Sequence, residues 1–323
     1  MVGAARRRAS GPGTRVTTWL VTGAGGLLGR DMSAVLPPGR TTALTRQGLD
    51  ITDFEAVADT VGRLCPDIVV NCAAWTDVDA AENHEAAATE VNATAVRNLA
   101  RVCARTGARL LHISTDYVFS GAGPGGEPRR TPYPENADPR PLTAYGRSKR
   151  AGERAVLDVL PDAATVIRTG WLYGRHGRSF VRTVLDRARS AEESHVVNDQ
   201  YGQPTWSKSL AGRLKILGEA TSRPGVLHLT STGHATWYEL AQEIYRWAGA
   251  DAALVSPIST ADLGRPAPRP AWSVLAHDRA SAAGLGVHHH WRDELRRALP
   301  HLVDGLKGRT PQRNRDEETH GHR

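Results

Sequence analysis

The stretch VTGAGGLLG, residues 21–29, places three glycines at Gly23, Gly26 and Gly29. A β-branched run, residues 17–22, precedes these glycines, and a helical pattern follows them. This order predicts a tight turn from strand to helix, where the backbone can approach a pyrophosphate and helix amides face its charge. A glycine pattern alone also fits a plain connection. Because both flanking elements are visible here, we interpret the stretch as a dinucleotide-binding turn.

Short β-branched runs continue to alternate with longer helical patterns as far as Leu111. That alternation predicts α/β class, with a Rossmann-type doubly wound parallel sheet and a smaller C-terminal α+β substrate-binding lobe. An alanine-rich stretch, residues 80–106, predicts one long helix capped by Gly107. The expected strands are 17–22, 41–44, 67–71, 109–114, 165–169 and 226–230, and the other expected helices are 144–160, 180–189, 208–219 and 237–247.

The chain has 323 residues, more than one compact layer of sheet and helices needs. We expect an NAD(P)-binding domain over residues 14–174 and a substrate lobe over 175–303 that returns elements to the sheet. Polar tails at 1–13 and 304–323 are expected to be disordered. Residues 120–141 are crowded with Gly and Pro, which predicts an irregular surface loop.

Composition bears on partners and compartment. Of the net charge of +7, residues 1–15 carry four charges and residues 304–323 carry one, so +2 remains on the rest. That balance is too even for a nucleic-acid-binding surface. The chain contains no run of about 18 apolar residues and no signal-peptide pattern, so we expect a cytoplasmic protein that does not bind membranes. Cys65, Cys72 and Cys103 lack metal-ligand spacing and are expected to be buried, reduced thiols.

The choice of dinucleotide depends on the end of the second strand. An acidic residue about twenty positions after the glycines normally binds the adenosine 2′-hydroxyl of NAD. This chain has Thr45 and Arg46 there, and a hydroxyl beside a guanidinium suits a 2′-phosphate, which predicts NADPH, with NADH still possible. Asp50 and Ile51 are candidates to flank the adenine. A helix-capping turn over residues 50–53 is nearly as good an interpretation.

The catalytic candidates are Tyr145 and Lys149, which are four residues apart at the start of a helix and so share one face. Thr115 ends a strand at the edge where this fold presents its site. Hydride delivery to a ketone leaves an alkoxide, and a tyrosine with a pKa of about 10 donates its proton reluctantly. We expect Lys149 to lower that pKa and to bond the nicotinamide ribose, and Thr115 to hold the carbonyl oxygen. The plain alternative is a surface Tyr and Lys pair beside a strand-end Thr.

Taken together, these motifs resemble the dTDP-4-dehydrorhamnose reductase family of extended short-chain dehydrogenases. The similarity covers roughly residues 16–275 and extends to antibiotic deoxysugar reductases such as the dihydrostreptose synthase of streptomycin biosynthesis. The motifs that carry it are NCAAWTDVDAAE (71–82), STDYVF (114–119), YGRSK (145–149) with AGE (151–153), RTGW (168–171) and NDQYGQPT (198–205).

The resemblance implies NAD(P)H-dependent reduction of the 4-keto group of a dTDP-4-keto-6-deoxy-L-hexose. Tyr145 matches the active-site acid, Lys149 its partner and Thr115 the third member. The remaining implied contacts are Gly26, Leu27 and Leu28 for the pyrophosphate; Asp50 and Ile51 for the adenine; Ala73, Ala74 and Trp75 for the nicotinamide side; and Asp116 and Trp171 for the sugar.

One departure from the family is Trp272, which stands where the family usually has Asn and puts the exact sugar in doubt. No metal is expected in the chemistry, and a monomer and a homodimer both remain open. Two other functions fit the same scaffold. They are a non-catalytic NADP-binding subunit of the methionine adenosyltransferase type and a sugar-nucleotide epimerase.

Overall fold

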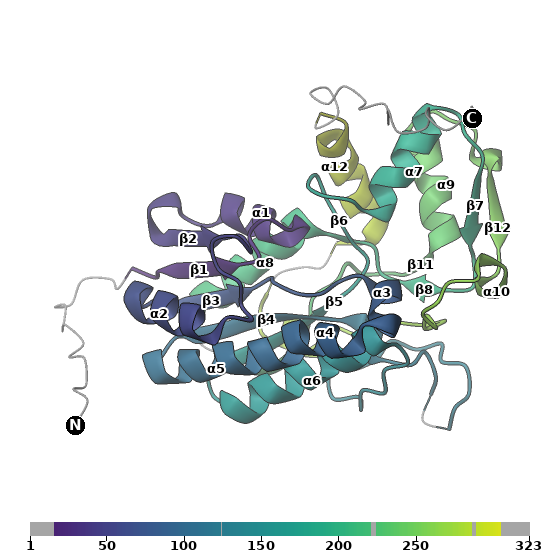
Figure 1. The fold of residues 1–323 in the computed structure, drawn as a ribbon. Helices are drawn as coiled ribbons and strands as arrows, with labels where there is room; N and C mark the ends of the chain where they lie inside the picture. The colour runs from purple at the N-terminus through teal and green to yellow at the C-terminus, as the bar shows by residue number, and fades with distance from the viewer. Residues whose placement is uncertain (1–15, 124, 221–223, 286–288, 305–323) are drawn as a thin grey trace, which may run out of the picture.

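The computed structural model describes residues 16–123, 125–220, 224–285 and 289–304. The tails expected at 1–13 and 304–323 lie outside these residues, except that residue 304 ends the last helix. Figure 1 shows a layered sheet and helices beside a second group of helices and short strands.

The central sheet has six strands in the order β10-β5-β4-β3-β1-β2, and every pair is parallel. The order reverses at β1, and the glycine turn follows that strand directly. In a sheet of this kind the ligand crevice lies at such a reversal, outside the carboxyl ends of the strands. The strands are β1 Trp19–Thr22, β2 Thr41–Leu44, β3 Ile68–Asn71, β4 Arg109–Thr115, β5 Ala164–Thr169 and β10 Gly225–His228.

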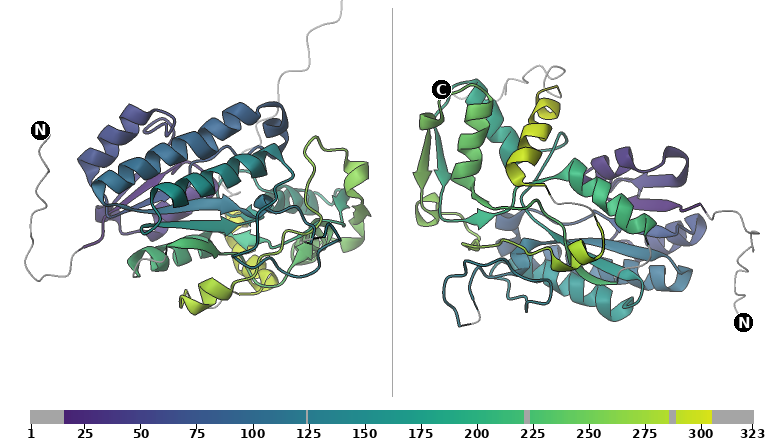
Figure 2. Two further views of the ribbon diagram at one scale, coloured as in Figure 1. Left: turned by 90° about the horizontal axis from the view of Figure 1, so that it is seen from below. Right: turned by 180° about the vertical axis from the view of Figure 1, so that it is seen from behind.

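Helices cover both faces of the sheet, as the two further views in Figure 2 show. On one face α1, Leu27–Val35, packs with α8, Ser207–Glu219, over an apolar cluster that includes Trp19 and Met32. On the other face lie α2 Phe54–Leu64, α5 Ala95–Thr106 and α6 Ala144–Val159. Strands β1 and β3 are buried at every residue, which explains why each is apolar apart from its last residue. The predicted α/β class with a doubly wound parallel sheet is confirmed.

The single helix expected over residues 80–106 is wrong, because the chain breaks at His84. The segment forms α3 Val78–Asn83, α4 Glu85–Thr89, a π-helical turn Glu90–Thr94, and α5, which ends at the predicted cap Gly107 with φ 74°. The π turn presents Asn92 toward Trp75, whose backbone N–H it accepts at 2.9 Å and whose carbonyl it bonds at 3.1 Å. Such π turns are frequent at functional sites.

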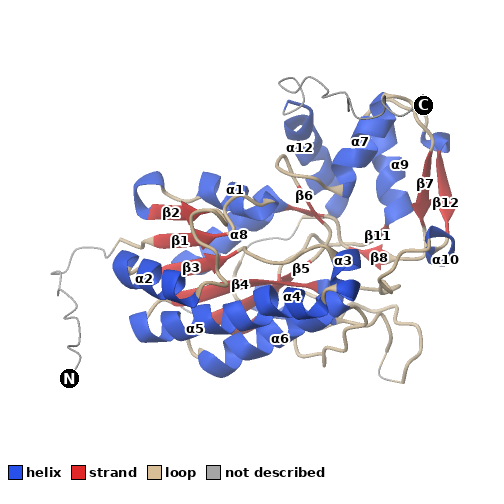
Figure 3. Ribbon diagram, in the orientation of Figure 1, coloured by secondary structure: helices blue, strands red, loops and turns tan. Residues whose placement is uncertain are grey.

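A second group of helices and short strands has its own apolar core. Figure 3 colours its helices blue and its strands red. Helices α7 (Phe180–Arg189), α9 (Trp237–Trp247) and α12 (Trp291–Asp304) supply most of its buried residues, and the parallel pair β7 (Ser194–Val197) and β12 (Val255–Ile258) lies against α9. The other elements of this group are β6 Leu172–Tyr173, β8 Tyr201–Gly202, β9 Thr205–Trp206, β11 Ala235–Thr236 and α10 Thr260–Leu263. Helix α11, Asp278–Ala282, packs instead against β10 of the central sheet.

The cysteines differ from expectation. Cys103 is buried and Cys72 is partly covered, but Cys65 is exposed. Cys65 ends α2 in a left-handed conformation, φ 42°, and Pro66 follows, so the chain turns at the surface there. In the part of the chain that the structure describes, no helix has both the length and the apolar character needed to cross a bilayer.

Candidate active site

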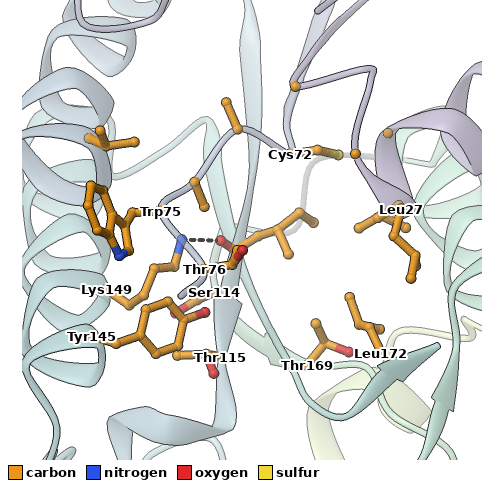
Figure 4. Close-up of a pocket in the computed structure, with 18 of the residues that line it drawn as sticks. Leu27, Cys72, Trp75, Thr76, Ser114, Thr115, Tyr145, Lys149, Thr169 and Leu172 are labelled. Carbon is orange, nitrogen blue, oxygen red and sulfur yellow. Dashed lines mark hydrogen bonds between the residues drawn. The ribbon is translucent and has the colours of Figure 1, made fainter. Parts of the chain in front are cut away.

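A pocket of about 860 Å³ opens at the carboxyl edge of the sheet. Its lining includes every residue proposed from the sequence for a catalytic, cofactor or sugar role. In Figure 4, Tyr145 and Lys149 lie on one side of this space, and Leu27 lies across from them. These lining residues are Gly23, Gly26, Leu27, Leu28, Gly29, Arg46, Asp50, Ile51, Ala73, Ala74, Trp75, Thr115, Asp116, Tyr145, Lys149 and Trp171.

The glycine turn is closely packed. A Cβ on Gly23, which has φ 66°, would lie 2.5 Å from the Ala73 nitrogen, and one on Gly29 would lie 2.2 Å from the Gly23 carbonyl oxygen. Gly26 is the residue just before α1, and it has no side chain that could accept from the first amide groups of that helix. The first-turn N–H groups therefore remain available for an anion such as a pyrophosphate.

At the far end of the pocket, Arg46 is 82% exposed and its Nε lies 3.0 Å from Asp50 Oδ2. Asp50 also accepts from the Thr52 amide at 3.0 Å, and these bonds hold the pKa of Asp50 below its usual value. The cap of α2 is Asp53, which accepts from the Ala56 amide at 3.0 Å. Asp50 is thus a turn residue that also lines the pocket. The exposed Arg46 is free to exchange its ion pair for a phosphate.

The predicted catalytic pair shares one face of α6. Thr143 caps this helix by accepting from the Gly146 amide at 2.9 Å. Lys149 is buried, and its Nζ donates to the Ile113 carbonyl at 2.7 Å, the dashed line in Figure 4. Burial lowers the pKa of Lys149 to about 8.

The pKa of Tyr145 differs from the sequence expectation. Burial raises this pKa to about 12, a Thr115 hydrogen bond lowers it in part, and the Asp116 charge raises it further. The expected lowering by Lys149 is absent in this structure, since the ammonium is directed to the Ile113 carbonyl. The phenol is consequently held in its protonated, acidic form at neutral pH.

Asp116 is buried at 3% exposure beside the catalytic residues. Thr115 Oγ1 donates to its Oδ1 at 3.1 Å, and Ser273 Oγ donates to its Oδ2 at 2.5 Å. Burial raises the pKa of Asp116 to about 6, and these two hydrogen bonds oppose that rise. A Cβ on Gly170 would lie 2.6 Å from the Asp116 Cγ, so this glycine makes room for the carboxyl group. Neither Ser273 nor Gly170 was predicted from the sequence as a site residue.

Trp171 has φ 50° and stacks on Trp237, with ring centroids 3.4 Å apart and planes at 2°. Trp237 also lines the pocket, although it begins α9 in the second lobe. The sequence contains no signal for this pairing apart from the two aromatic residues themselves. One indole face of Trp171 is covered by Trp237, so that face is closed to a sugar.

Trp272 is held by packing and by one hydrogen bond. Its side chain is buried, its Nε1 donates to the Thr131 carbonyl at 3.0 Å, and it does not line the pocket. It joins the Gly- and Pro-rich loop to the segment at Tyr201, with which it forms a backbone bridge. Trp272 therefore contributes to packing outside the described pocket, and its effect on the choice of sugar stays a prediction.

A second contact ties the segment around Trp272 to α3. Arg269 Nη2 lies 2.9 Å from Asp79 Oδ2, and the Ala267 amide donates to Asp79 Oδ1 at 3.2 Å. Arg269 also hydrogen-bonds Tyr117, whose ring lies edge-on to that of Tyr145 with centroids 6.1 Å apart. Asp79 belongs to the motif over 71–82, but its arginine partner was not foreseen.

A doubly wound parallel sheet, a glycine turn at its reversal point, and a Thr, Tyr and Lys set facing that turn define a class of protein. The chain is a nicotinamide-dinucleotide-dependent oxidoreductase of the short-chain dehydrogenase type.

Comparisons narrow this class. The protein-family model described as the RmlD substrate binding domain matches residues 17–303 of this chain. A Streptomyces griseus protein named dTDP-4-dehydrorhamnose reductase is 48% identical, covering 90% of this chain and 95% of its own. A Streptomyces antibioticus protein named probable dTDP-4,6-dihydroxy-2-methyloxan-3-one 4-ketoreductase is 49% identical, covering 88% and 95%. The crystal structure of Bacillus anthracis dTDP-4-dehydrorhamnose reductase in complex with NADP has TM-score 0.82 and 35% identity, covering 88% of this chain and 99% of that one. This chain belongs to the dTDP-4-dehydrorhamnose reductase family.

Proposed function

We propose that the protein reduces the 4-keto group of a dTDP-4-keto-6-deoxy-L-hexose with NADPH. The observation that carries this proposal is the meeting of Thr115, Tyr145 and Lys149 at one end of a pocket whose other end is the glycine turn. The names of the Streptomyces relatives support a dTDP-linked keto sugar, and the Bacillus anthracis structure supports NADP.

The pocket residues fit such a cofactor because the turn leaves no room for side chains. A Cβ at Gly23 or at Gly29 would clash with the neighbouring backbone atoms named above, so the turn keeps its close approach only with glycine at both positions. In this proposal Gly26, Leu27 and Leu28 hold the pyrophosphate, Thr45 and Arg46 hold the 2′-phosphate, and Asp50 and Ile51 flank the adenine. Residues 73–75 line the nicotinamide side. The bound nicotinamide would supply a hydride to the carbonyl carbon.

The chain's own residues manage the proton. Tyr145, protonated at neutral pH, gives its phenolic hydrogen to the ketone oxygen as that oxygen becomes an alcohol. The resulting phenolate takes a proton from solvent before the next turnover, and Lys149, an ammonium below its pKa of about 8, would bond the nicotinamide ribose. Asp116 and the free edge of Trp171 contact the sugar.

The finer assignment concerns the sugar. We place the enzyme in deoxysugar biosynthesis of the type that supplies antibiotic sugars, with dihydrostreptose formation among the candidates. The Streptomyces antibioticus relative supports this, because its name specifies a keto sugar other than dehydrorhamnose. The two Streptomyces relatives are about equally similar to this chain, so similarity alone does not choose between their sugars.

The experiment is a reductase assay on purified protein. NADPH and a panel of dTDP-4-keto-6-deoxy sugars are mixed with the enzyme, and the absorbance of reduced nicotinamide is followed. We expect oxidation with at least one sugar, and a higher Michaelis constant for NADPH but not NADH in Arg46→Ala. Retained NADP binding with no oxidation of any sugar would instead favour the non-catalytic binding subunit.

A further inference from the structure

Ser273 connects the second lobe to the catalytic end of the pocket. It lies in the segment after α10 and is buried at 3% exposure. Its backbone N–H donates to the Tyr201 carbonyl at 2.9 Å, while its hydroxyl donates to Asp116 Oδ2 at 2.5 Å. Because the backbone bond fixes the serine, the hydroxyl reaches Asp116 only while this segment is docked.

Asp116 depends on such neutral donors. Among the described residues no Arg, Lys or His forms an ion pair with it; Arg269 is paired with Asp79, and Lys149 donates to a carbonyl. The other titratable groups that face it are the phenols of Tyr117 and Tyr145, which bring no positive charge. The carboxylate is therefore stabilised by the hydroxyls of Ser273 and Thr115 and by nearby backbone amides.

Thr115 sits between this carboxylate and the catalytic phenol. Its hydroxyl accepts from the Tyr117 amide at 3.1 Å and has a single hydrogen to donate. That hydrogen goes to Asp116 Oδ1 at 3.1 Å, although the Tyr145 phenol is also within the hydroxyl's reach. An ionised Asp116 keeps the hydrogen. A protonated Asp116 can donate to Thr115 instead, and Thr115 is then free to donate to Tyr145 or to the ketone oxygen.

From this chain of contacts we infer that Ser273 is a positioning residue: by holding Asp116 as a hydrogen-bond acceptor, it sets the direction in which Thr115 donates beside Tyr145. The inference deepens the proposed function, on which it rests, by linking the docked segment of the second lobe to the proton-donating group. Ser273 does not line the pocket, so in this inference it acts through its hydrogen bond to Asp116.

The test compares Ser273→Ala with a matched control, Ser207→Ala. Ser207 is also buried and donates to a buried carboxylate, that of Asp31, at 2.5 Å, but neither residue lines the pocket. The carboxyl band of Asp116 is followed by infrared spectroscopy as a function of pH, and Asp116→Asn assigns it. Losing one hydrogen bond to a charged group should raise the pKa of Asp116 by about one unit in Ser273→Ala and leave it unchanged in Ser207→Ala.

Turnover supplies the second readout. The pH at which kcat changes should move upward by about one unit in Ser273→Ala only, while the Kd for NADP stays at the wild-type value and shows that the variant is folded. An unchanged titration of Asp116 in Ser273→Ala would overturn the inference. The infrared measurement needs no turnover. If the protein failed to oxidise NADPH with every sugar of the panel, the proposed function would be refuted, but the infrared test of Ser273 could still be carried out.

Discussion

At the scale of single residues, the site is governed by burial. Burial raises the pKa of Tyr145 to about 12 and that of Asp116 to about 6, and it lowers the pKa of Lys149 to about 8. Each shift disfavours the charged form; hydrogen bonds oppose it at Tyr145 and Asp116, whereas the charge of Glu153 opposes it at Lys149. A phenol that starts protonated suits a group whose task is to donate a proton.

The first prediction concerns Tyr145→Phe. Removing the hydroxyl removes the proton donor but leaves the ring and its packing, so kcat should fall by about 10²- to 10⁴-fold while the Kd for NADP stays near the wild-type value. Steady-state turnover and fluorescence titration measure the two quantities. Turnover within twofold of the wild type would show that another group donates the proton.

The second prediction concerns stability and Asp116→Asn. The pKa of Asp116 is about 6 in the folded protein against 3.8 as its ordinary value. The folded state therefore binds the proton more tightly, and its stability falls as pH rises from about 4 through about 6. The amide cannot ionise, so at pH 8 the variant should unfold with a free energy about 2–3 kcal/mol higher than the wild type. Urea denaturation at pH 8 and at pH 3.5 tests this, and equal differences at both pH values would contradict it.

At the scale of elements, close backbone contacts decide how helices meet the sheet. Helix α6 carries Gly152, where a Cβ would lie 2.0 Å from the Asn92 carbonyl oxygen in the π-helical turn. The π-helical turn also holds the backbone of Trp75 at the edge of the pocket, because the Asn92 side chain accepts from the Trp75 amide. The contact of α6 with the π turn thus positions both the catalytic pair and the segment over residues 73–75.

The third prediction compares two glycines of one helix, α8. A Cβ on Gly218 would lie 2.0 Å from the buried ring of Trp19, whereas a Cβ on Gly212 would meet nothing within 4 Å. Gly212→Ala should raise the free energy of unfolding by about 0.5–1 kcal/mol, because alanine loses less backbone entropy in a helix. Gly218→Ala should lower it by about 1–3 kcal/mol through overpacking. Chemical denaturation of both variants gives the comparison, and the same sign for both would contradict it.

At the scale of the whole molecule, the segment that follows α10 joins the second lobe to the dinucleotide-binding half. Arg269 pairs with Asp79 on α3, and Ser273 bonds Asp116 after β4. Through these two contacts the segment lies against α3 and against the end of β4, which forms one end of the pocket.

The fourth prediction tests this connection with Arg269→Ala. The side chains of Arg269 and Asp79 are only 16% and 22% exposed, so their pair is little screened by solvent. Its loss should raise the KM for the sugar by about fivefold, equivalent to about 1 kcal/mol, with the Kd for NADP unchanged. Arg265 lies 3.3 Å from the same carboxylate but is 56% exposed, so Arg265→Ala is the control and should change KM little. A larger effect in the control would contradict the assignment.

Much of the fold followed from local patterns. The spacing of Gly23, Gly26 and Gly29 predicted the turn, and apolar periodicity predicted the strands and most helices. Tyr145 and Lys149 were found because residues four apart share a helix face. The break at His84 and the π turn at Asn92 were not predicted. The π turn places Asn92 in contact with Trp75, which lies 17 residues away in the sequence and so leaves no local pattern.

By itself, the sequence determined the class of sheet, the turn that begins its first helix, and the three side chains that face that turn, because each depends on neighbours within a strand or a helical turn. Only the tertiary structure decided that Ser273 meets Asp116 across 157 residues, that Trp237 covers Trp171, and that Lys149 bonds a carbonyl in place of lowering the pKa of Tyr145. The physical reason is that ionisation and hydrogen-bond direction depend on burial and on donors from distant segments, which meet only when the two lobes pack.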